Sequence, residues 1–158
     1  MTEIIPECDV TIATFADVLN AAAIDCTVEK GGDIYVTTFL FNFWISIDEE
    51  RKFVRFYSYW PVAVDTPEDR IYQFVNDCND SLILVQFSVT EDRQRFYGHY
   101  MMPYREGLIK SHILRMARLF SELFHQAVEH KDTEDLLGVE SLDACASIPD
   151  AAERGAVH

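Results

Sequence analysis

Positive charge is scarce in this chain of 158 residues, which carries 13 lysines and arginines against 27 aspartates and glutamates. The formal net charge is −14 at pH 7. This charge opposes sequence-independent binding of nucleic acid, because neutralising phosphate groups requires a surplus of lysine and arginine. It also disfavours an anionic membrane surface. We therefore predict no nucleic-acid partner, and note that acidity of this degree also serves solubility alone.

A long apolar run is missing as well. The longest apolar-rich stretch, residues 39–47, contains Asn42 and Ser46 and is far shorter than a membrane span. The opening sequence MTEIIPECDV has an acidic residue where a secretory signal needs basic ones, and no apolar core follows. We therefore expect a cytoplasmic protein without membrane insertion.

Motifs for metal binding and catalysis are also lacking. The four cysteines show no C-x-x-C spacing, which predicts reduced thiols rather than disulfides or a metal site. His125 and His130 are five residues apart, and the chain has no H-E-x-x-H, G-x-S-x-G or glycine-rich phosphate loop. We expect no metal, no cofactor and no enzymatic activity. The alternative is a small enzyme or ligand-binding domain with a cleft near His99 or His112.

Apolar residues make up 49% of the chain, and their spacing predicts three helices in a globular fold. Spacings of three and four residues predict helices over 11–23 and 108–130. Between them, the sequence TPED at 66–69 predicts a helix start, with Thr66 as the cap and Pro67 at the first helical position. Cys78 falls on the buried stripe of this second helix.

Residues 34–60 are rich in β-branched and aromatic side chains, which predicts one long strand, a tight turn and a second strand. With Glu49 and Glu50 as the loop, Ile45 would pair with Val54. A second hairpin is predicted over residues 82–102. With Glu91 and Asp92 as its loop, Phe87 would pair with Phe96. Each hairpin would have one apolar face and one face of mixed aromatic and polar residues.

These elements predict an α+β fold of order αβ(ββ)α(ββ)α. It would contain an antiparallel sheet of two hairpins plus a short strand, with three helices gathered on the apolar face. We expect residues 1–131 to form a single α+β domain. Residues 132–158 shift in composition to Asp, Glu, Ala, Ser and Gly, which predicts an acidic, disordered tail.

A polar cluster, residues 76–80, separates the second helix from the second hairpin. A calcium loop is excluded, because Leu82 stands where the turn needs glycine and Ser88 where a bidentate glutamate is required. Asparagine and aspartate suit a helix end, where their side chains bond nearby backbone groups. We therefore interpret Asn76 and Asn79 as structural residues of a helix end.

The mixed face of the sheet is the predicted functional surface. Its aromatic, cationic and hydrogen-bonding side chains are of the kind enriched at protein interfaces, and an arginine beside a tryptophan could stack on it. The alternative is a solvated face, or one covered by the N-terminal segment or the tail. The predicted partner-binding residues are Trp44, Arg55, Tyr57, Tyr59, Tyr97 and His99.

Three segments are distinctive: FVNDCN, which contains the Asn76-x-x-Asn79 pair, the hairpin LILVQFSVTEDRQRFYGHYMM and the terminal LFSELFHQAV. With the order of the elements, they resemble the YbjN-like family of bacterial sensory transduction regulators. The likeness covers residues 11–130, and this chain has Cys78 where the family commonly has tryptophan. The resemblance implies a fold similar to type III secretion chaperones. It also implies a small, non-enzymatic, regulatory or chaperone-like protein that binds protein partners and often forms a homodimer.

Overall fold

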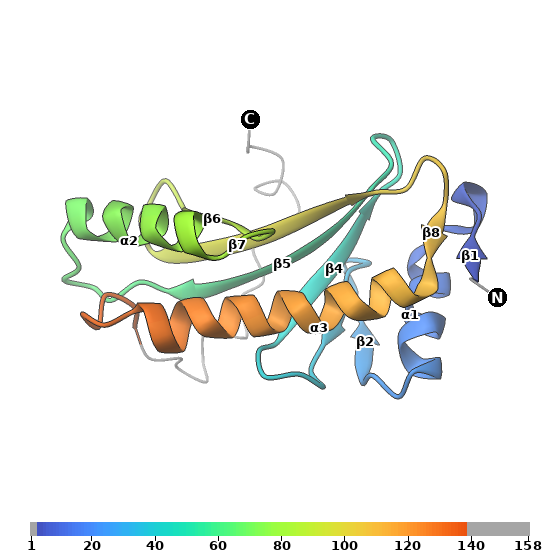
Figure 1. The fold of residues 1–158 in the computed structure, drawn as a ribbon, viewed down its shortest axis with the longest axis horizontal. Helices are drawn as coiled ribbons and strands as arrows, with labels where there is room; N and C mark the ends of the chain where they lie inside the picture. The colour runs from blue at the N-terminus through green and yellow to red at the C-terminus, as the bar shows by residue number, and fades with distance from the viewer. Residues whose placement is uncertain (1–2, 139–158) are drawn as a thin grey trace.

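The structure is a computed structural model that describes residues 3–138. Within this range the chain forms a six-stranded antiparallel sheet of order β2-β3-β4-β5-β7-β6 (Figure 1), and a two-stranded sheet, β1-β8, lies beside it. The strands are β1 (Ile4–Ile5), β2 (Cys26–Val28), β3 (Ile34–Val36), β4 (Phe43–Asp48), β5 (Phe53–Pro61), β6 (Gln86–Val89), β7 (Arg95–Pro103) and β8 (Leu108–Ile109). The helices are α1 (Ile12–Ala21), α2 (Glu68–Ser81) and α3 (Lys110–Gln126), with a short 3₁₀ helix at Glu7–Asp9. The predicted antiparallel α+β fold with three helices is confirmed.

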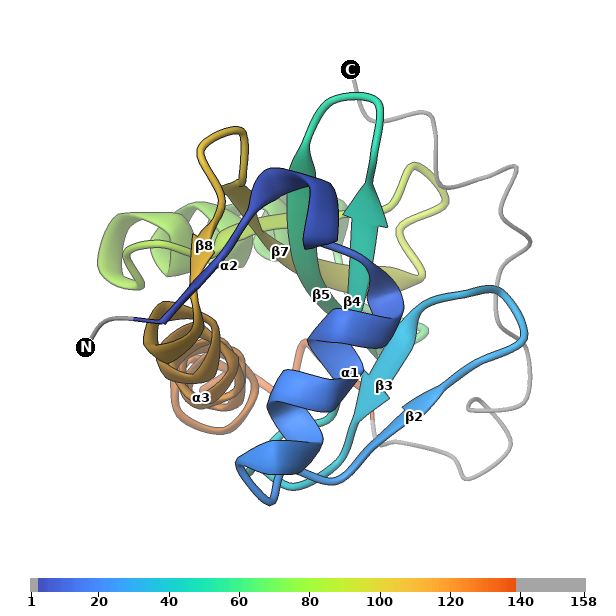
Figure 2. The ribbon, with the colours of Figure 1, turned by 90° about the vertical axis from the view of Figure 1, so that its right-hand side faces the viewer.

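The helices pack on one face of the large sheet, and Figure 2 shows α1 and α3 on the same side of it. Helix α1 begins after Thr11, whose hydroxyl oxygen accepts a hydrogen bond from the Thr14 amide at 3.2 Å. The ring of Phe120 on α3 lies 5.3 Å from that of Phe43 on β4. The ring of Phe74 on α2 lies 5.1 Å from that of Phe96 on β7. The apolar stripes of the helices and the apolar face of the sheet therefore form one core.

The long strand predicted to begin at Ile34 is wrong, because β3 and β4 are two separate strands that pair antiparallel. The connecting loop, residues 37–42, is held against α3 at Phe41. The Phe41 amide donates to the Ser121 hydroxyl at 2.7 Å, and that hydroxyl donates to the Phe41 carbonyl at 2.8 Å. A buried serine on a helix thus supplies the partner that a neighbouring strand would otherwise provide.

Both hairpins have a register two residues away from the predicted one. Ile45 pairs with Phe56 instead of Val54, and Phe87 pairs with Gly98 instead of Phe96. The turns are longer than the predicted two-residue loops. A shift of two residues keeps the side chains of the paired strands on their predicted faces, because side chains alternate along a strand with a period of two. The division into an apolar and a mixed face therefore agrees with the prediction.

The start of α2 also differs from the prediction. The Thr66 hydroxyl does not cap the helix but donates to the Leu136 carbonyl at 2.7 Å. Pro67 is the residue that precedes the helix, and its carbonyl accepts from the amides of Arg70 and Ile71, both at 3.1 Å. The Thr66 hydroxyl therefore bonds to a segment far away in the sequence and not to the start of the helix, as the local sequence predicted.

Residues 132–138 pack against the sheet and α2. The Asp132 carboxylate accepts from the amides of Leu136 and Leu137, both at 2.9 Å. Both leucines are buried, and Leu137 forms an antiparallel bridge with Val62. The packed fold therefore continues past the boundary expected at residue 131. The rest of the expected tail, residues 139–158, lies outside the described residues.

Candidate protein-interaction face

One row of side chains runs across all six strands of the large sheet. Consecutive cross-strand pairs join Thr27 to Tyr35, then Trp44, then Tyr57, then His99, and end at Gln86. Their neighbours along the strands point to the helices, so this row lies on the opposite face. We call this surface the aromatic face and define it as Tyr35, Trp44, Arg55, Tyr57, Tyr59, Arg95, Tyr97 and His99. It contains every residue of the predicted partner-binding set and adds Tyr35 and Arg95.

The rings of the aromatic face pack against one another, and Trp44 stacks on two of them. Trp44 and Tyr59 are nearly parallel, with ring centroids 5.2 Å apart and an interplanar angle of 6°. Trp44 also lies 4.8 Å from Tyr35 and 5.8 Å from Tyr57. These are the separations at which aromatic pairs attract beyond the area they bury. The tryptophan is thus the centre of a stacked cluster.

Two arginines extend the cluster with positive charge. The Arg55 guanidinium lies 4.8 Å from the Tyr57 ring centroid, and that of Arg95 lies 5.1 Å from the Tyr59 ring centroid. These distances allow cation–π attraction. The predicted stacking of Arg55 on Trp44 differs from this arrangement. The observed register sets Ser46 opposite Arg55, and the serine hydroxyl accepts from Arg55 Nε at 3.1 Å.

Acidic side chains next to the β2–β3 turn hold the polar ends of two rings. Trp44 Nε1 donates to the Glu29 carboxylate at 3.1 Å, and the Tyr57 hydroxyl donates to the Asp33 carboxylate at 2.5 Å. Fixing these donors orients the rings, because each bond sets the position of the ring edge. Sequence analysis missed Glu29 and Asp33, although both flank the two glycines of the EKGGD segment, which are a turn signal.

His99 occupies the β7 end of the aromatic row, 5.6 Å from the Tyr97 ring. Burial lowers the pKa of His99, and the nearby Arg55 charge lowers it further. Its Nδ1 atom is buried and has no hydrogen-bond partner among residues 3–138. A histidine with these properties is neutral at pH 7, since the ordinary pKa is already near 6.5. His99 therefore contributes an aromatic surface rather than a positive charge.

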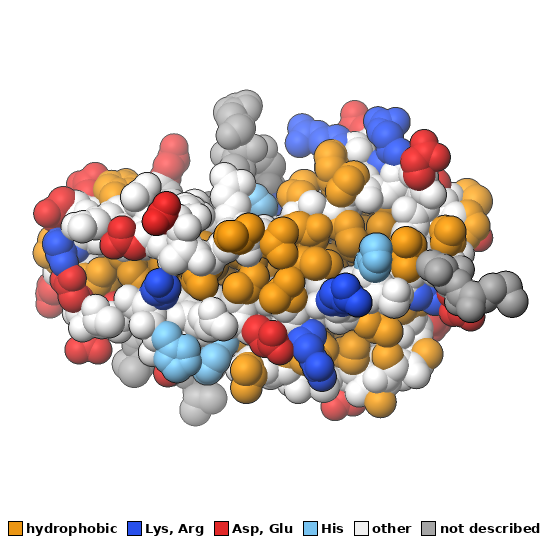
Figure 3. Space-filling view, viewed as in Figure 1, with side chains coloured by type: hydrophobic (Ala, Val, Ile, Leu, Met, Phe, Trp, Pro, Cys, Tyr) orange, Lys and Arg blue, Asp and Glu red, His pale blue; other side chains and the backbone are white. Residues whose placement is uncertain are grey.

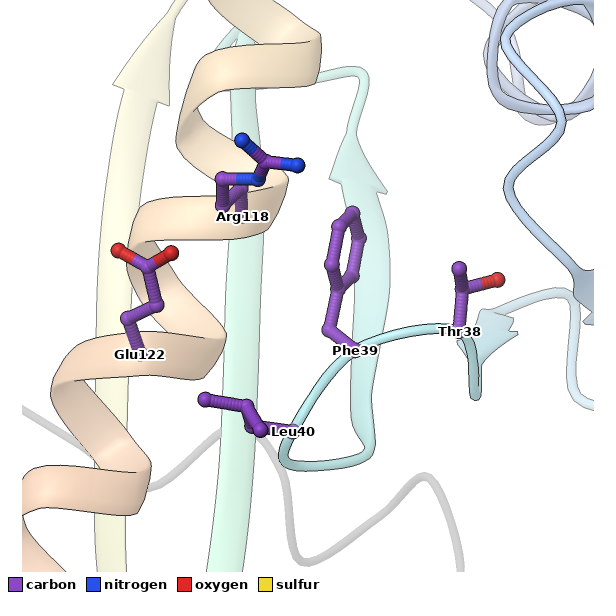
Figure 4. A pocket seen from close by; sticks show the side chains of 5 residues that line it. All are labelled: Thr38, Phe39, Leu40, Arg118 and Glu122. Atoms are coloured by element: carbon purple, nitrogen blue, oxygen red, sulfur yellow. The ribbon is translucent and has the colours of Figure 1, made fainter.

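The described cavities lie elsewhere, along α3. Figure 4 shows Phe39 and Leu40 of the 37–42 loop facing Arg118 and Glu122 of α3. The hollow that these residues line has a volume of about 370 Å³. A second hollow of similar volume continues along the helix beside His125 and His130. Neither hollow is lined by His99 or His112, the residues of the alternative cleft. His112 is exposed on the first turn of α3.

His125 and His130 meet despite their spacing of five residues. The chain is a π-helix over Ala127–Lys131, and the two rings lie 5.7 Å apart. A wider helical turn brings residues five apart to the same side, which the spacing rule for α-helices does not anticipate. Among the residues that the structure describes, no group of three potential metal ligands gathers here or elsewhere. Over the same residues, no helix has the length and apolar character needed to cross a membrane.

The polar cluster at residues 76–80 forms the last turn and a half of α2. Asn79 reaches across to the edge strand β6, where its amide oxygen accepts from the Phe87 amide at 2.8 Å and its amide nitrogen donates to the Phe87 carbonyl at 3.0 Å. Asn76 is exposed. Cys78 is fully buried, and burial raises the pKa of its thiol to about 12. A thiol with this pKa is not a nucleophile at neutral pH.

The side of the molecule that carries α2 and α3 has its own apolar surface. Figure 3 shows hydrophobic side chains gathered along the middle of this side. The loop between α2 and β6 exposes Ile83 and Leu84, which are 77% and 50% accessible. Within residues 3–138, strand β6 pairs with residues 96–99 of β7 and with no other strand. Among the described strands, none pairs with residues 100–103 of β7 on this side.

These features define an antiparallel α+β protein, and its fold is similar to that of a chain in a solved chaperone–effector complex. A chain in the structure titled "Structure of the HopA1-SchA Chaperone-Effector Complex" superposes with a TM-score of 0.52 at 14% identity, covering 73% of this chain and 91% of that one. A chain from the complex of the Yersinia pestis type III secretion chaperone SycH with a fragment of YscM2 has a TM-score of 0.49 at 12% identity, covering 75% of this chain and 98% of that one.

The family is established by the sequence match. Residues 11–132 match the YbjN family, described as "Putative bacterial sensory transduction regulator". The chain belongs to this family. The crystal structure of E. coli YbjN, titled a putative transcription regulator, superposes with a TM-score of 0.68 at 12% identity, covering 81% of this chain and 96% of that one. No curated protein matches the chain.

Proposed function

We propose that this protein is a non-enzymatic regulatory or chaperone-like module that binds another protein through the aromatic face. The observation that carries the proposal is the continuous row from Tyr35 through Trp44 and Tyr57 to His99, which spans four neighbouring strands. Tryptophan, tyrosine and arginine dominate the binding energy of protein interfaces. Rings already held by stacking and by fixed hydrogen bonds lose little conformational entropy when a partner binds.

The chemistry of the face indicates the kind of partner. Arg55 and Arg95 place positive charge over the rings of Tyr57 and Tyr59, whereas the whole chain is strongly acidic. A segment with apolar side chains and carboxylates would satisfy both the rings and the guanidinium groups. We therefore propose a partner segment of this composition. The proposal includes a cytoplasmic location, which is consistent with the free thiols of Cys8 and Cys26.

We also propose that the protein is a homodimer, formed on the side that carries α2 and α3. Ile83 and Leu84 are large apolar side chains that the monomer leaves exposed. Residues 100–103 of β7 extend beyond the end of β6 and offer backbone groups to another strand. The same patch on a second copy would complete both features by two-fold symmetry. This surface is separate from the aromatic face, so a dimer could still bind a partner.

Substitution of Trp44 tests the partner-binding proposal. The Trp44→Ser variant removes the centre of the stack, and we expect at least a tenfold loss of a co-purifying protein relative to the unchanged chain, since one interface anchor contributes about 2 kcal/mol or more. Tyr72→Ser is the matched control, because Tyr72 is exposed on α2, outside the aromatic face. Tagged forms of all three chains would be purified from the native cell and analysed by quantitative mass spectrometry.

The outcomes separate the two surfaces. Circular dichroism and thermal melting would establish that Trp44→Ser keeps its fold, and sedimentation would give the mass of each form. Retention of the same partner at the same level by folded Trp44→Ser would exclude the aromatic face as the binding surface. A monomer at micromolar concentrations in the unchanged chain would exclude the proposed homodimer.

A further inference from the structure

The chain leaves the described fold beside the aromatic face. Gly138, the last described residue, donates its amide hydrogen to the Pro61 carbonyl at 2.8 Å. Its carbonyl accepts from Trp60 Nε1 at 2.7 Å. Pro61 pairs across the sheet with Arg95, whose guanidinium lies over the ring of Tyr59. Residue 139 therefore begins next to one end of the aromatic face.

The direction of the chain at this point leads back along β5. Leu137 and Val62 form an antiparallel bridge, and the bond from Gly138 to Pro61 continues it. A chain that runs antiparallel to β5 advances from Pro61 toward Arg55. The pairs that join β4 to β5 end at Tyr57. The last residues of β5, 59–61, therefore have no β4 residue beside them, and Gly138 lies next to this stretch.

Residues 139–158 match the chemistry of this surface. The acidic side chains of the segment outnumber its single arginine, Arg154, and apolar residues lie between them. The four acidic residues are Glu140, Asp143, Asp150 and Glu153. Carboxylates complement the guanidinium groups of Arg55 and Arg95, and apolar residues complement the stacked rings. The partner chemistry inferred above is thus present within the chain itself.

The segment is also long enough. Twenty residues span up to about 70 Å when extended, whereas the nine residues of β5 rise about 30 Å along the strand. A segment that starts at Gly138 can therefore pass Tyr59 and Tyr57 and reach Arg55 with residues to spare. Linkage through a short connection gives the segment a high effective concentration at the face.

We infer that residues 139–158 bind the aromatic face of their own chain, with their carboxylates at Arg55 and Arg95 and their apolar side chains on Trp44 and Tyr59. The segment is then an intramolecular occupant of the surface. One consequence rests on the proposed function: a protein partner that binds the aromatic face must first displace the segment. The occupancy itself requires no partner and can be tested on the purified full chain.

A nitroxide label on Cys145 tests the inference. Cys8→Ser and Cys26→Ser remove the accessible thiols, while Cys78 is fully buried and remains unlabelled. We expect selective loss of intensity from the Trp44 indole N–H and from backbone amides of residues 55–59 in the ¹H–¹⁵N spectrum. Amides at the exposed end of α1 and on the exposed side of α2 should keep their intensity. Equal attenuation on both sides of the sheet, or none, would overturn the inference.

Charge variants sharpen the result. Arg55→Gln with Arg95→Gln should restore at least half of the lost intensity, because the segment then loses its opposite charges. Arg118→Gln, an exposed arginine on α3 on the other side of the sheet, is the matched control and should change nothing. Attenuation that is the same in both variants would show that the arginines do not hold the segment and would contradict the stated contacts.

The two proposals fail in different ways. Loss of the selective attenuation, with partner capture still dependent on Trp44, would reject the intramolecular occupant alone. Selective attenuation without any partner dependent on Trp44 would support the occupant and reject the proposed function. Added salt gives a further check, since screening at 1 M ionic strength shortens the Debye length to about 3 Å and should weaken attenuation that depends on exposed charge.

Discussion

The two faces of the large sheet are built from alternate residues of the same strands, yet their side chains are held in different ways. On the core face, Phe43, Ile45 and Phe56 are completely buried against the helices. On the aromatic face, Trp44 and Tyr57 lie against each other and reach acidic groups with their polar ends. The core face is fixed by exclusion of water and close packing. The aromatic face is fixed by stacking and directed hydrogen bonds. Tyr57 is buried, whereas the rings around it, such as Trp44 and Tyr59, stay half-buried and suited to contact with another chain.

Truncation of one ring on each face of β5 measures this difference directly. Phe56→Ala should lower the free energy of unfolding by about 3–5 kcal/mol, because it leaves a cavity in the core. Tyr59→Ala should cost about 1–2 kcal/mol, since this ring is only half-buried and its removal leaves no closed cavity. Denaturant titrations of both variants give the two values, and equal costs would show that the aromatic face is part of the core.

The two asparagines of the second helix offer a finer comparison. Asn79→Ala removes both hydrogen bonds to Phe87 on the edge strand, and we expect a loss of about 1–2 kcal/mol in the free energy of unfolding. Asn76→Ala changes an exposed residue of the same type in the same helix and should stay within about 0.5 kcal/mol. Urea titration provides both numbers, and an equal effect at the two positions would contradict a bridging role specific to Asn79.

The contact made by Asn79 also has a structural interpretation. Its amide presents one donor and one acceptor to the backbone of Phe87, as a neighbouring strand would. An edge strand with unpaired backbone groups invites pairing with other chains. Asn79 thus protects part of the β6 edge while it anchors the end of α2. Sequence analysis placed this residue at a helix end bonded to nearby backbone, but the partner lies eight residues further on, across a loop.

The faces of the strands could be predicted from sequence because they depend only on alternation, and a register error of two residues leaves them unchanged. The register itself depends on the turns. Lys52 and Arg93 adopt positive φ angles of 61° and 58° in the two hairpin turns. Neither is a glycine or an asparagine, so the sequence carries no indication of these left-handed residues.

Contacts between segments that lie far apart in the sequence could not be predicted from the sequence either. Thr66 has the position and chemistry of a helix cap, but the Leu136 carbonyl takes its hydroxyl. Phe41 looks like part of a strand, but Ser121 of α3 satisfies its backbone groups. Among the residues of the aromatic face, Tyr35 was missed because the break between β3 and β4 was not predicted. In each case tertiary structure overrides a correct local preference.

The smallest expected difference between the faces concerns pH and His99, the titratable residue at the end of the aromatic row. The pKa of His99 is lowered in the folded protein by burial and then by Arg55, whereas the unfolded chain has an ordinary pKa near 6.5. Between these two values the unfolded state binds more protons, so stability falls as pH drops. The contribution of His99 to the free energy of unfolding is fully present above about pH 6.5 and is lost as pH falls toward the folded pKa.

The His99→Gln variant removes this titration, so the free energy of unfolding of the variant should decline less between pH 7 and pH 5.5 than that of the unchanged chain. His112→Gln, at an exposed site on α3, is the control and should follow the unchanged chain. Parallel stability curves for the His99→Gln variant and the unchanged chain would show that His99 is not desolvated on the aromatic face.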